Sequence, residues 1–381
     1  MVPRQGTGYR WVQRVGDLEE AVRSLVREPY VAVDLEADSL YRYEERICLI
    51  QISGRDGDWL IDALAIPTLE PLRPLLEDPG VEKVLHGADY DIRLLKRCTG
   101  IQPYPIFDTM VAAQIVGLPK VGLSDLLLEK FGVELVKRFQ KADWGRRPLP
   151  DAMVRYALED TRHLLRLKEA LVAELQALGR LDWARRQFEA LLQVRPRPRT
   201  PPDALRIPGS RDLDDRGRAV LQALLDWREE VARKRDVPPF KVMGTEALLT
   251  LARRAEALAV DLEGIPGLSS RLVATLGEGI REAIRKGYNA PPIPWSVAGR
   301  PSPAKTHRGG RRRFILLKAV RDTRARELGL DPGVLCPNAA LKELALSPPE
   351  GLEASLDRTL KDWQREILAE EFRKALLGTG G

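Results

Sequence analysis

Two acidic residues, Asp34 and Glu36, stand at the end of a strongly apolar run in the segment 29–53. The run at 30–33 is typical of a buried β-strand. Because side chains alternate along a strand, residues two apart point to the same face, so the two carboxylates share one side. Two like charges on a buried face are costly unless a cation neutralises them. Carboxylate oxygens suit Mg²⁺ or Mn²⁺, although a strand-end carboxylate in an ion pair explains this stretch equally well.

Further carboxylates follow at two places in the chain. Asp89 and Asp91 lie at a predicted strand-to-helix turn, where α/β proteins place functional groups. The pattern leaves open which of the two is functional, and Asp89 is better placed to cap the helix that follows. Tyr156 and Asp160 are four residues apart in a predicted helix and therefore share a face. Taken alone, this pair also fits a core tyrosine beside a solvated acid.

Four acidic residues from a strand, a turn and a helix can converge on a pair of divalent cations. Two ions about 4 Å apart would stabilise both the attacking and the leaving oxygen of a phosphodiester displaced in line. This chemistry needs no nucleophilic side chain, which agrees with the lack of a Ser-His or Cys-His arrangement. We therefore predict a site for two Mg²⁺ or Mn²⁺ ions.

The elements that must position these residues indicate an α/β fold with a mixed sheet. Apolar runs at 47–53 and 58–62, separated by Gly54 and Gly57, predict a hairpin after the first strand and hence an antiparallel meander. Asp17 and Asp108 are expected to cap the helices that follow them. Apolar residues recur at helical spacing in the segments 17–27, 69–76, 90–96, 108–116, 123–131 and 151–178.

Two stretches of linker composition, 194–212 and 290–310, divide the chain. We expect an α/β domain at 1–193 and two small all-α domains at 213–289 and 311–381. The two small domains are predicted to be copies of each other, because an offset of 93 residues superimposes Arg228 on Arg321. Internal similarity at a fixed offset is a strong indication of repeated structure.

The chain of 381 residues carries a formal net charge of +6, which favours an acidic partner such as nucleic acid. A basic run that includes Arg311, Arg312 and Arg313 can follow a phosphate backbone, although a solvated linker gives the same pattern. The cysteines are scattered and no apolar run is long enough to cross a membrane. We therefore expect a cytoplasmic monomer with reduced thiols.

Several motifs resemble those of the ribonuclease D type of DEDD exonuclease, over about residues 10–190. The resemblance implies a ribonuclease H-like sheet and 3′-to-5′ hydrolysis of RNA ends, with release of nucleoside 5′-monophosphates. The tyrosine four residues before the last aspartate marks the tyrosine-bearing subclass. The motifs are DLE at 34–36, HGADYDIRLL at 86–95, FDT at 107–109, ADWGRRPLP at 142–150 and YALEDTRHLL at 156–165.

Carried over position by position, the resemblance implies two metal sites. Asp34, Glu36 and Asp160 would hold the first ion, and Asp34 and Asp91 would hold the second. Tyr156 would orient the attacking water. All five side chains that the family requires are present, which argues against an inactive scaffold.

The two predicted helical domains resemble HRDC modules, which implies that they bind nucleic acid. The match in the first copy is best around Trp227 and Arg228. In the second copy Val320 replaces the tryptophan, which weakens the inference that both copies share one binding surface.

The sequence as a whole predicts a metal-dependent 3′-to-5′ exoribonuclease that trims structured RNA such as tRNA precursors. A DNA exonuclease fits the same carboxylates, because a preference for RNA depends on contacts to the 2′-hydroxyl group. A binding scaffold that keeps the carboxylates for structure is the alternative from another class. Nucleotide release and its dependence on metal distinguish this scaffold from an enzyme.

Overall fold

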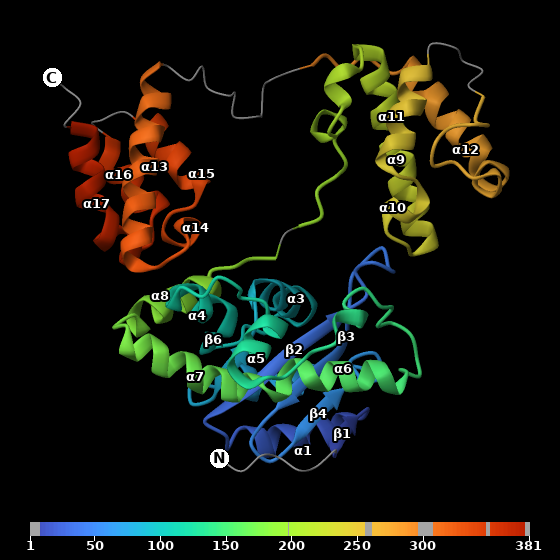
Figure 1. Ribbon diagram of the computed structural model, residues 1–381. Coiled ribbons are helices and arrows are strands. Elements are labelled where there is room, and N and C mark those ends of the chain that lie inside the picture. Colours follow the sequence, from blue (N-terminus) through green and yellow to red (C-terminus); the bar gives the residue numbers. More distant parts are fainter. Residues whose placement is uncertain (1–7, 197, 256–260, 296–307, 348–350, 378–381) are drawn as a thin grey trace. The chain divides into compact units, whose positions relative to one another are not determined.

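The computed structural model describes residues 8–196, 198–255, 261–295, 308–347 and 351–377. Its contacts divide the chain into two units (Figure 1). The first comprises Met1–Ala37, Ile47–Pro196 and Pro303–Gly381, and the second comprises Asp38–Arg46 and Arg197–Ser302. Among the described helices, none is both long and apolar enough to cross a membrane.

The first unit contains a six-stranded mixed sheet in the order β1-β4-β3-β2-β5-β6. The β2/β3 and β3/β4 pairs are antiparallel, which confirms the predicted meander, and the other pairs are parallel. Edge strand β1 was not predicted. The strands are β1 (Tyr9–Val12), β2 (Tyr30–Ala37), β3 (Ile47–Ser53), β4 (Asp58–Ile61), β5 (Glu82–Leu85) and β6 (Ile106–Asp108).

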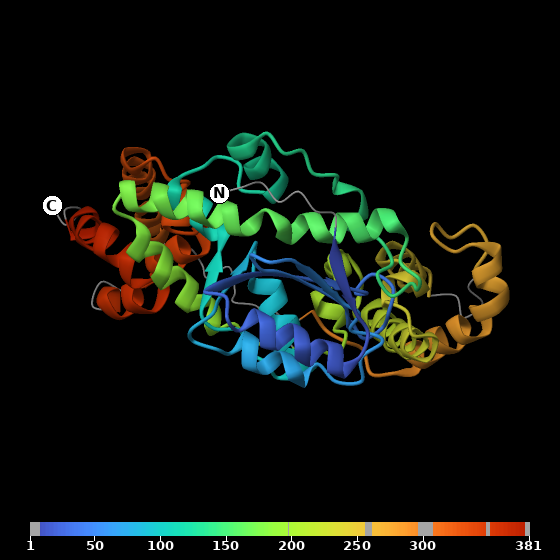
Figure 2. The same cartoon turned by 90° about the horizontal axis from the view of Figure 1, so that it is seen from below.

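Helices cover both faces of this sheet (Figure 2). Apolar side chains of α1, α2 and α3 pack on one face, and those of α6 pack on the other. The helices are α1 (Val15–Leu25), η1 (Glu70–Leu72), α2 (Arg73–Leu76), α3 (Asp89–Thr99), α4 (Thr109–Val116), α5 (Leu123–Phe131), η2 (Lys137–Phe139), α6 (Asp151–Arg162), α7 (Leu164–Ala177) and α8 (Leu181–Leu192).

Two of the predicted local features are corrected by the structure. Asp17 does not cap α1, because the cap position is Arg14 and no side chain accepts a hydrogen bond there. The helix predicted at 151–178 is interrupted at His163, which ends α6 and precedes α7. The predicted cap at Asp108 is confirmed, since its carboxylate accepts hydrogen bonds from the amides of Met110 and Val111.

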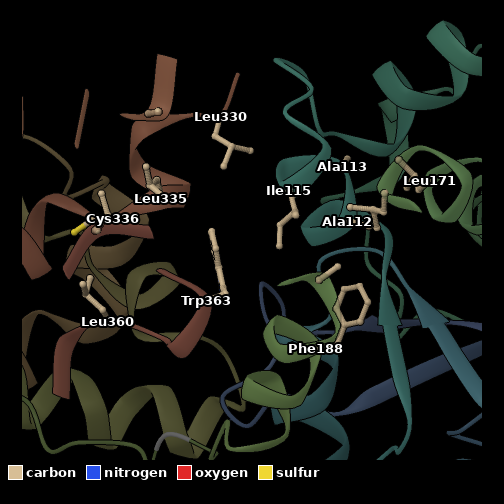
Figure 3. Packing of buried hydrophobic residues seen from close by; sticks show 14 of the residues in the cluster. Ala112, Ala113, Ile115, Leu171, Phe188, Leu330, Leu335, Cys336, Leu360 and Trp363 are labelled. Atoms are coloured by element: carbon tan, nitrogen blue, oxygen red, sulfur yellow. The ribbon is translucent and has the colours of Figure 1, made fainter. Parts of the chain in front are cut away.

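The C-terminal helices also belong to the first unit and share an apolar cluster with α4, α7 and α8. The Trp363 ring stacks on Trp183 with 5.4 Å between centroids. Figure 3 shows members of this cluster, including Ile115, Phe188 and Trp363. The helices are α13 (Arg308–Leu328), α14 (Pro332–Leu335), α15 (Asn338–Leu346), α16 (Leu352–Thr359) and α17 (Asp362–Leu377).

The second unit is built around a long helix and repeats the local structure of α13 and α14. Arg228 donates a hydrogen bond to the carbonyl oxygen of Met243 (3.1 Å), and Arg321 donates to that of Cys336 (2.9 Å). Both pairs obey the predicted offset of 93 residues. The helices are η3 (Ala204–Arg206), η4 (Ser210–Asp212), α9 (Asp215–Arg235), α10 (Pro239–Val242), α11 (Thr245–Arg254) and α12 (Ser270–Asn289).

The connection between β2 and β3, residues 38–46, is part of the second unit. Tyr43 is its buried anchor and donates a hydrogen bond to Glu229 (2.7 Å). The guanidinium of Arg199 lies 3.7 Å from the centroid of the Tyr43 ring. The strand that carries Asp34 and Glu36 is therefore continuous with a loop held by the first helical domain.

The predicted linkers differ in what the structure describes. Residues 194–212 include η3 and η4, and Ala204 is buried in the apolar core of the second unit. Most of the stretch 290–310 lies outside the described residues. The domain boundaries predicted from composition therefore stay predictions.

Candidate active site

Three carboxylates from β2 and α6 form a tight acidic cluster. Asp34, Glu36 and Asp160 each offer an oxygen, and these oxygens all lie within 4.8 Å of one another. The strand places Asp34 and Glu36 on one face, as their alternation predicts. Helix α6 packs on β2 and β3 and so brings Asp160 to the same place. Three hard oxygen ligands in this arrangement can hold a divalent cation.

Asp91 contributes a fourth carboxylate to the same cavity and is only 6% exposed. Its neighbour Asp89 instead forms an ion pair with Arg93 (2.8 Å) and has a side chain that is 53% exposed. Asp89 does not cap α3, because the cap position is Ala88 and no side-chain cap is present. The prediction that Asp89 caps this helix is therefore wrong, and Asp91 is the residue that faces the cavity.

The turn before α3 is fixed by Asp108, at the end of β6. Its carboxylate accepts hydrogen bonds from the amides of Gly87 (3.0 Å) and Ala88 (2.8 Å). Gly87 has a φ of +75°, a conformation that side-chain-bearing residues rarely adopt. The Nδ1 atom of His86 is hydrogen-bonded to the Thr109 hydroxyl group (2.9 Å) at the start of α4. Asp108 thus supports both helices beside the cavity.

Burial raises the pKa of every carboxyl group in this set. The pKa of Asp34 rises from 3.8 to about 7, and that of Asp160 rises from 3.8 to about 8, with Asp34 adding repulsion to the effect of burial. The pKa values of Glu36 and Asp91 lie well above their ordinary values, again through burial and then through acidic neighbours. Such a site gains stability from protons or from a cation.

Tyr156 lies one helical turn before Asp160, and both residues line the cavity. Burial and the neighbouring carboxylates raise the pKa of Tyr156, so its hydroxyl group stays protonated at neutral pH. Its ring contacts Phe139 (5.9 Å between centroids) and Trp144 (6.0 Å). The segment at 139–144 therefore fixes the direction in which the hydroxyl points.

The cavity has a volume of about 490 Å³ and is lined by all five predicted catalytic residues. Reasoning from the sequence missed other lining residues, notably Tyr90, Val136 and Gln140. Tyr90 is exposed and lies between Asp89 and Asp91 in the motif at 86–95, so its position in that motif could have indicated that it lines the cavity. Val136 and Gln140 come from a segment without regular periodicity, and nothing in the pattern indicated them.

The residues predicted to bind nucleic acid lie in different surroundings. Trp227 is partly buried against the core of the second unit, and Arg228 points to the carbonyl oxygen of Met243. On α13, Arg311 and Arg312 are exposed. Arg313 instead donates a hydrogen bond to the carbonyl oxygen of Ala345 (2.7 Å). Nucleic-acid contact by these residues stays a prediction.

Comparison with known proteins decides the family. The 3′-5′ exonuclease family matches residues 9–176, and the HRDC domain family matches residues 217–284 and 311–375. A ribonuclease D from Gluconacetobacter diazotrophicus is 32% identical over 96% of this chain and 93% of its own length. The chain belongs to the ribonuclease D family. A ribonuclease D from Pseudomonas paraeruginosa is 31% identical over 96% of this chain and 97% of its own length.

Solved structures agree with this membership of the ribonuclease D family. RNase D of Escherichia coli, an exoribonuclease involved in structured RNA processing, has a TM-score of 0.73 and 26% identity. The match covers 98% of this chain and all of that one. The catalytic core of RRP6 from Trypanosoma brucei has a TM-score of 0.64 and 30% identity, over 74% and 79% of the two chains. The predicted fold and the predicted 3′-5′ exoribonuclease activity are thereby confirmed.

Proposed function

We propose that the acidic cavity hydrolyses RNA from its 3′ end with two divalent ions and releases nucleoside 5′-monophosphates. The observation that carries this proposal is the cluster of Asp34, Glu36 and Asp160, with oxygens within 4.8 Å of one another. Its donors are carboxylates, the ligands that Mg²⁺ and Mn²⁺ prefer. Their raised pKa values mean that the ionised carboxylates are costly in this buried place, and a divalent cation would offset that cost.

The proposed ligand sets are those that the family resemblance implies, and all four carboxylates line the cavity. Asp34, Glu36 and Asp160 would hold one ion, and Asp34 and Asp91 would hold the other. When bound, the ions would stabilise negative charge on the attacking and leaving oxygens of the phosphodiester. The rest of the cavity would bind and orient the end of the RNA chain.

Tyr156 is proposed to position the attacking water through its hydroxyl group. Tyr156 lines the cavity together with Asp160, and its raised pKa keeps the hydroxyl neutral. A neutral hydroxyl can donate one hydrogen bond and accept others, so it can orient a water without acting as a general base. The packing of its ring on Trp144 limits its movement.

The substrate is proposed to be structured RNA with a single-stranded 3′ end, such as a tRNA precursor. The exposed Arg311 and Arg312 on α13 can contact phosphate groups without reading sequence. A cytoplasmic location and a monomeric state are proposed from the sequence alone.

Matched RNA and DNA hairpins with 3′ tails and 5′ labels test this function. We expect the purified protein with Mg²⁺ or Mn²⁺ to shorten the RNA from its 3′ end and to release nucleoside 5′-monophosphates, identified by chromatography. Faster shortening of the DNA would favour the DNA exonuclease. Binding that survives chelation, with no nucleotide released under either metal, would favour a scaffold.

A further inference from the structure

Gln51, in the middle of β3, is a buried polar residue without an explained role. Its side chain is 0% exposed, and neither its Oε1 nor its Nε2 has a hydrogen-bond partner among the described residues. An unpaired buried amide is costly, because it gives up its hydrogen bonds to water. Leucine would fill a similar volume without this cost, so stability does not explain the amide group and a functional role is indicated.

The register of the sheet gives Gln51 an acidic neighbour. Gln51 pairs directly with Asp34 on β2 and with Leu60 on β4. Side chains of directly paired residues in an antiparallel sheet point to the same face, with Cβ atoms about 5 Å apart. Leu60 is apolar and belongs to the cluster under α6. Of these two cross-strand neighbours, Asp34 alone can accept a hydrogen bond through its side chain.

The next polar side chain on the same face of β3 is already satisfied. The Ser53 hydroxyl lies 2.8 Å from the Thr161 hydroxyl on α6 and donates to Asp58 (2.7 Å). Gln51, two residues earlier, has no such contact with α6. Ser53 therefore ties the sheet to the helix, whereas Gln51 lies beside Asp34 with its donor uncommitted.

We propose that Gln51 is a positioning residue for the Asp34 carboxylate. Its Nε2 donates a hydrogen bond to one oxygen of Asp34 in the cation-bound enzyme and so fixes the direction in which the remaining lone pairs point. An amide suits this place because it is neutral. A lysine or arginine would neutralise Asp34 and compete with the cation, whereas Gln51 orients the carboxylate and leaves its charge available. This inference rests on the proposed metal site.

Isothermal titration calorimetry with Mn²⁺ as the only ligand tests this inference without an activity assay. We expect Gln51→Leu to weaken Mn²⁺ binding about tenfold or more, the size of effect found for residues that orient metal ligands. Its melting temperature without metal should stay unchanged or rise, because a buried unpaired amide is removed. The matched control is Ser53→Ala, on the same strand and face, which should lower the melting temperature and leave Mn²⁺ affinity unchanged.

The outcomes separate this inference from the proposed function. Wild-type protein that binds Mn²⁺ together with a Gln51→Leu variant of equal affinity would overturn the role of Gln51 alone. Wild-type protein that binds no Mn²⁺ would overturn the proposed metal site and this role with it. Should Gln51→Leu fail to fold, Gln51→Met removes the same amide on a more adaptable side chain, and the same loss of affinity is expected.

Discussion

A carboxylate oxygen of Asp160 lies within 4.8 Å of one of Asp34. The two residues come from β2 and α6, and the packing of α6 on the sheet brings them together. Burial raises both pKa values, and repulsion from Asp34 adds to the rise for Asp160. In the family of 3′-5′ exonucleases to which this chain belongs, such a cluster is suited to hold a cation.

The free energy of unfolding of the metal-free protein should fall as pH rises through the range in which Asp34 and Asp160 lose their protons. The folded pKa values of Asp34 and Asp160 are about 7 and about 8, against ordinary values of 3.8. Between pH 3.8 and about pH 7 to 8, the folded state therefore binds more protons than the unfolded state. The stabilisation is therefore complete below about pH 4 and is lost as pH rises through about 7 to 8.

Mg²⁺ should raise the melting temperature more at about pH 8.5 than at about pH 6, because protons compete with it for the same oxygens. Calorimetry with and without Mg²⁺ measures both effects. A variant with Asp34→Asn and Asp160→Asn serves as the control and should show a shallower pH dependence. An equal pH dependence in this variant and the wild type would contradict the assignment.

Replacement of Tyr156 by phenylalanine should slow catalysis and preserve the fold. The variant keeps the ring packed on Trp144 and Phe139 and loses only the hydroxyl group. Loss of water positioning should lower kcat by about 10²-fold, with KM and Mn²⁺ affinity little changed. Steady-state kinetics of RNA cleavage measure kcat and KM. A rise in KM at constant kcat would show that Tyr156 binds substrate instead.

Exposed arginines of α13 should contribute to RNA affinity through phosphate contacts. The double variant Arg311→Gln with Arg312→Gln should bind RNA more weakly at low salt and reduce the slope of log affinity against log salt by about one per contact. The matched control is Arg324→Gln on the same helix, since Arg324 already pairs with Glu327 (2.8 Å). Equal salt slopes in the double variant and the control would contradict this role.

Arg228 and its structural equivalent Arg321 should each stabilise their own helical domain. Each donates a hydrogen bond to a backbone carbonyl 15 residues later, in Met243 or Cys336. Replacement by methionine should lower the free energy of unfolding by about 1–3 kcal/mol, because a carbonyl loses its partner in a partly buried place. Denaturant titration measures the loss. A drop in RNA affinity at unchanged stability for Arg228→Met would instead indicate a binding role.

The parts of the site that the sequence could predict depend on local pattern. Alternation along β2 places Asp34 and Glu36 on one face, and helical spacing relates Tyr156 to Asp160. The meander of β2, β3 and β4 follows from apolar runs separated by glycines. These features depend on residues close in the chain, so periodicity was enough to indicate them.

The parts that were missed depend on contacts between distant segments. Asp89 was expected to cap α3, but its carboxylate pairs with Arg93. The amides of the turn before α3 instead donate hydrogen bonds to Asp108, which lies at the end of β6. Helical periodicity continues through the break at His163, so it gave no sign of the interruption. The docking of Tyr43 on the first helical domain joins residues far apart in the sequence, and no local pattern marks it.

The most direct test of the account compares three single variants on a 5′-labelled RNA with a 3′ tail, in Mg²⁺. Asp34→Asn and Asp91→Asn should abolish the ladder of products shortened from the 3′ end, because both carboxylates line the cavity. Asp89→Asn should keep it, since Asp89 is exposed and pairs with Arg93. Full activity of Asp91→Asn, or an intact substrate with the wild-type protein in both Mg²⁺ and Mn²⁺, would contradict the proposed metal-dependent exonuclease site.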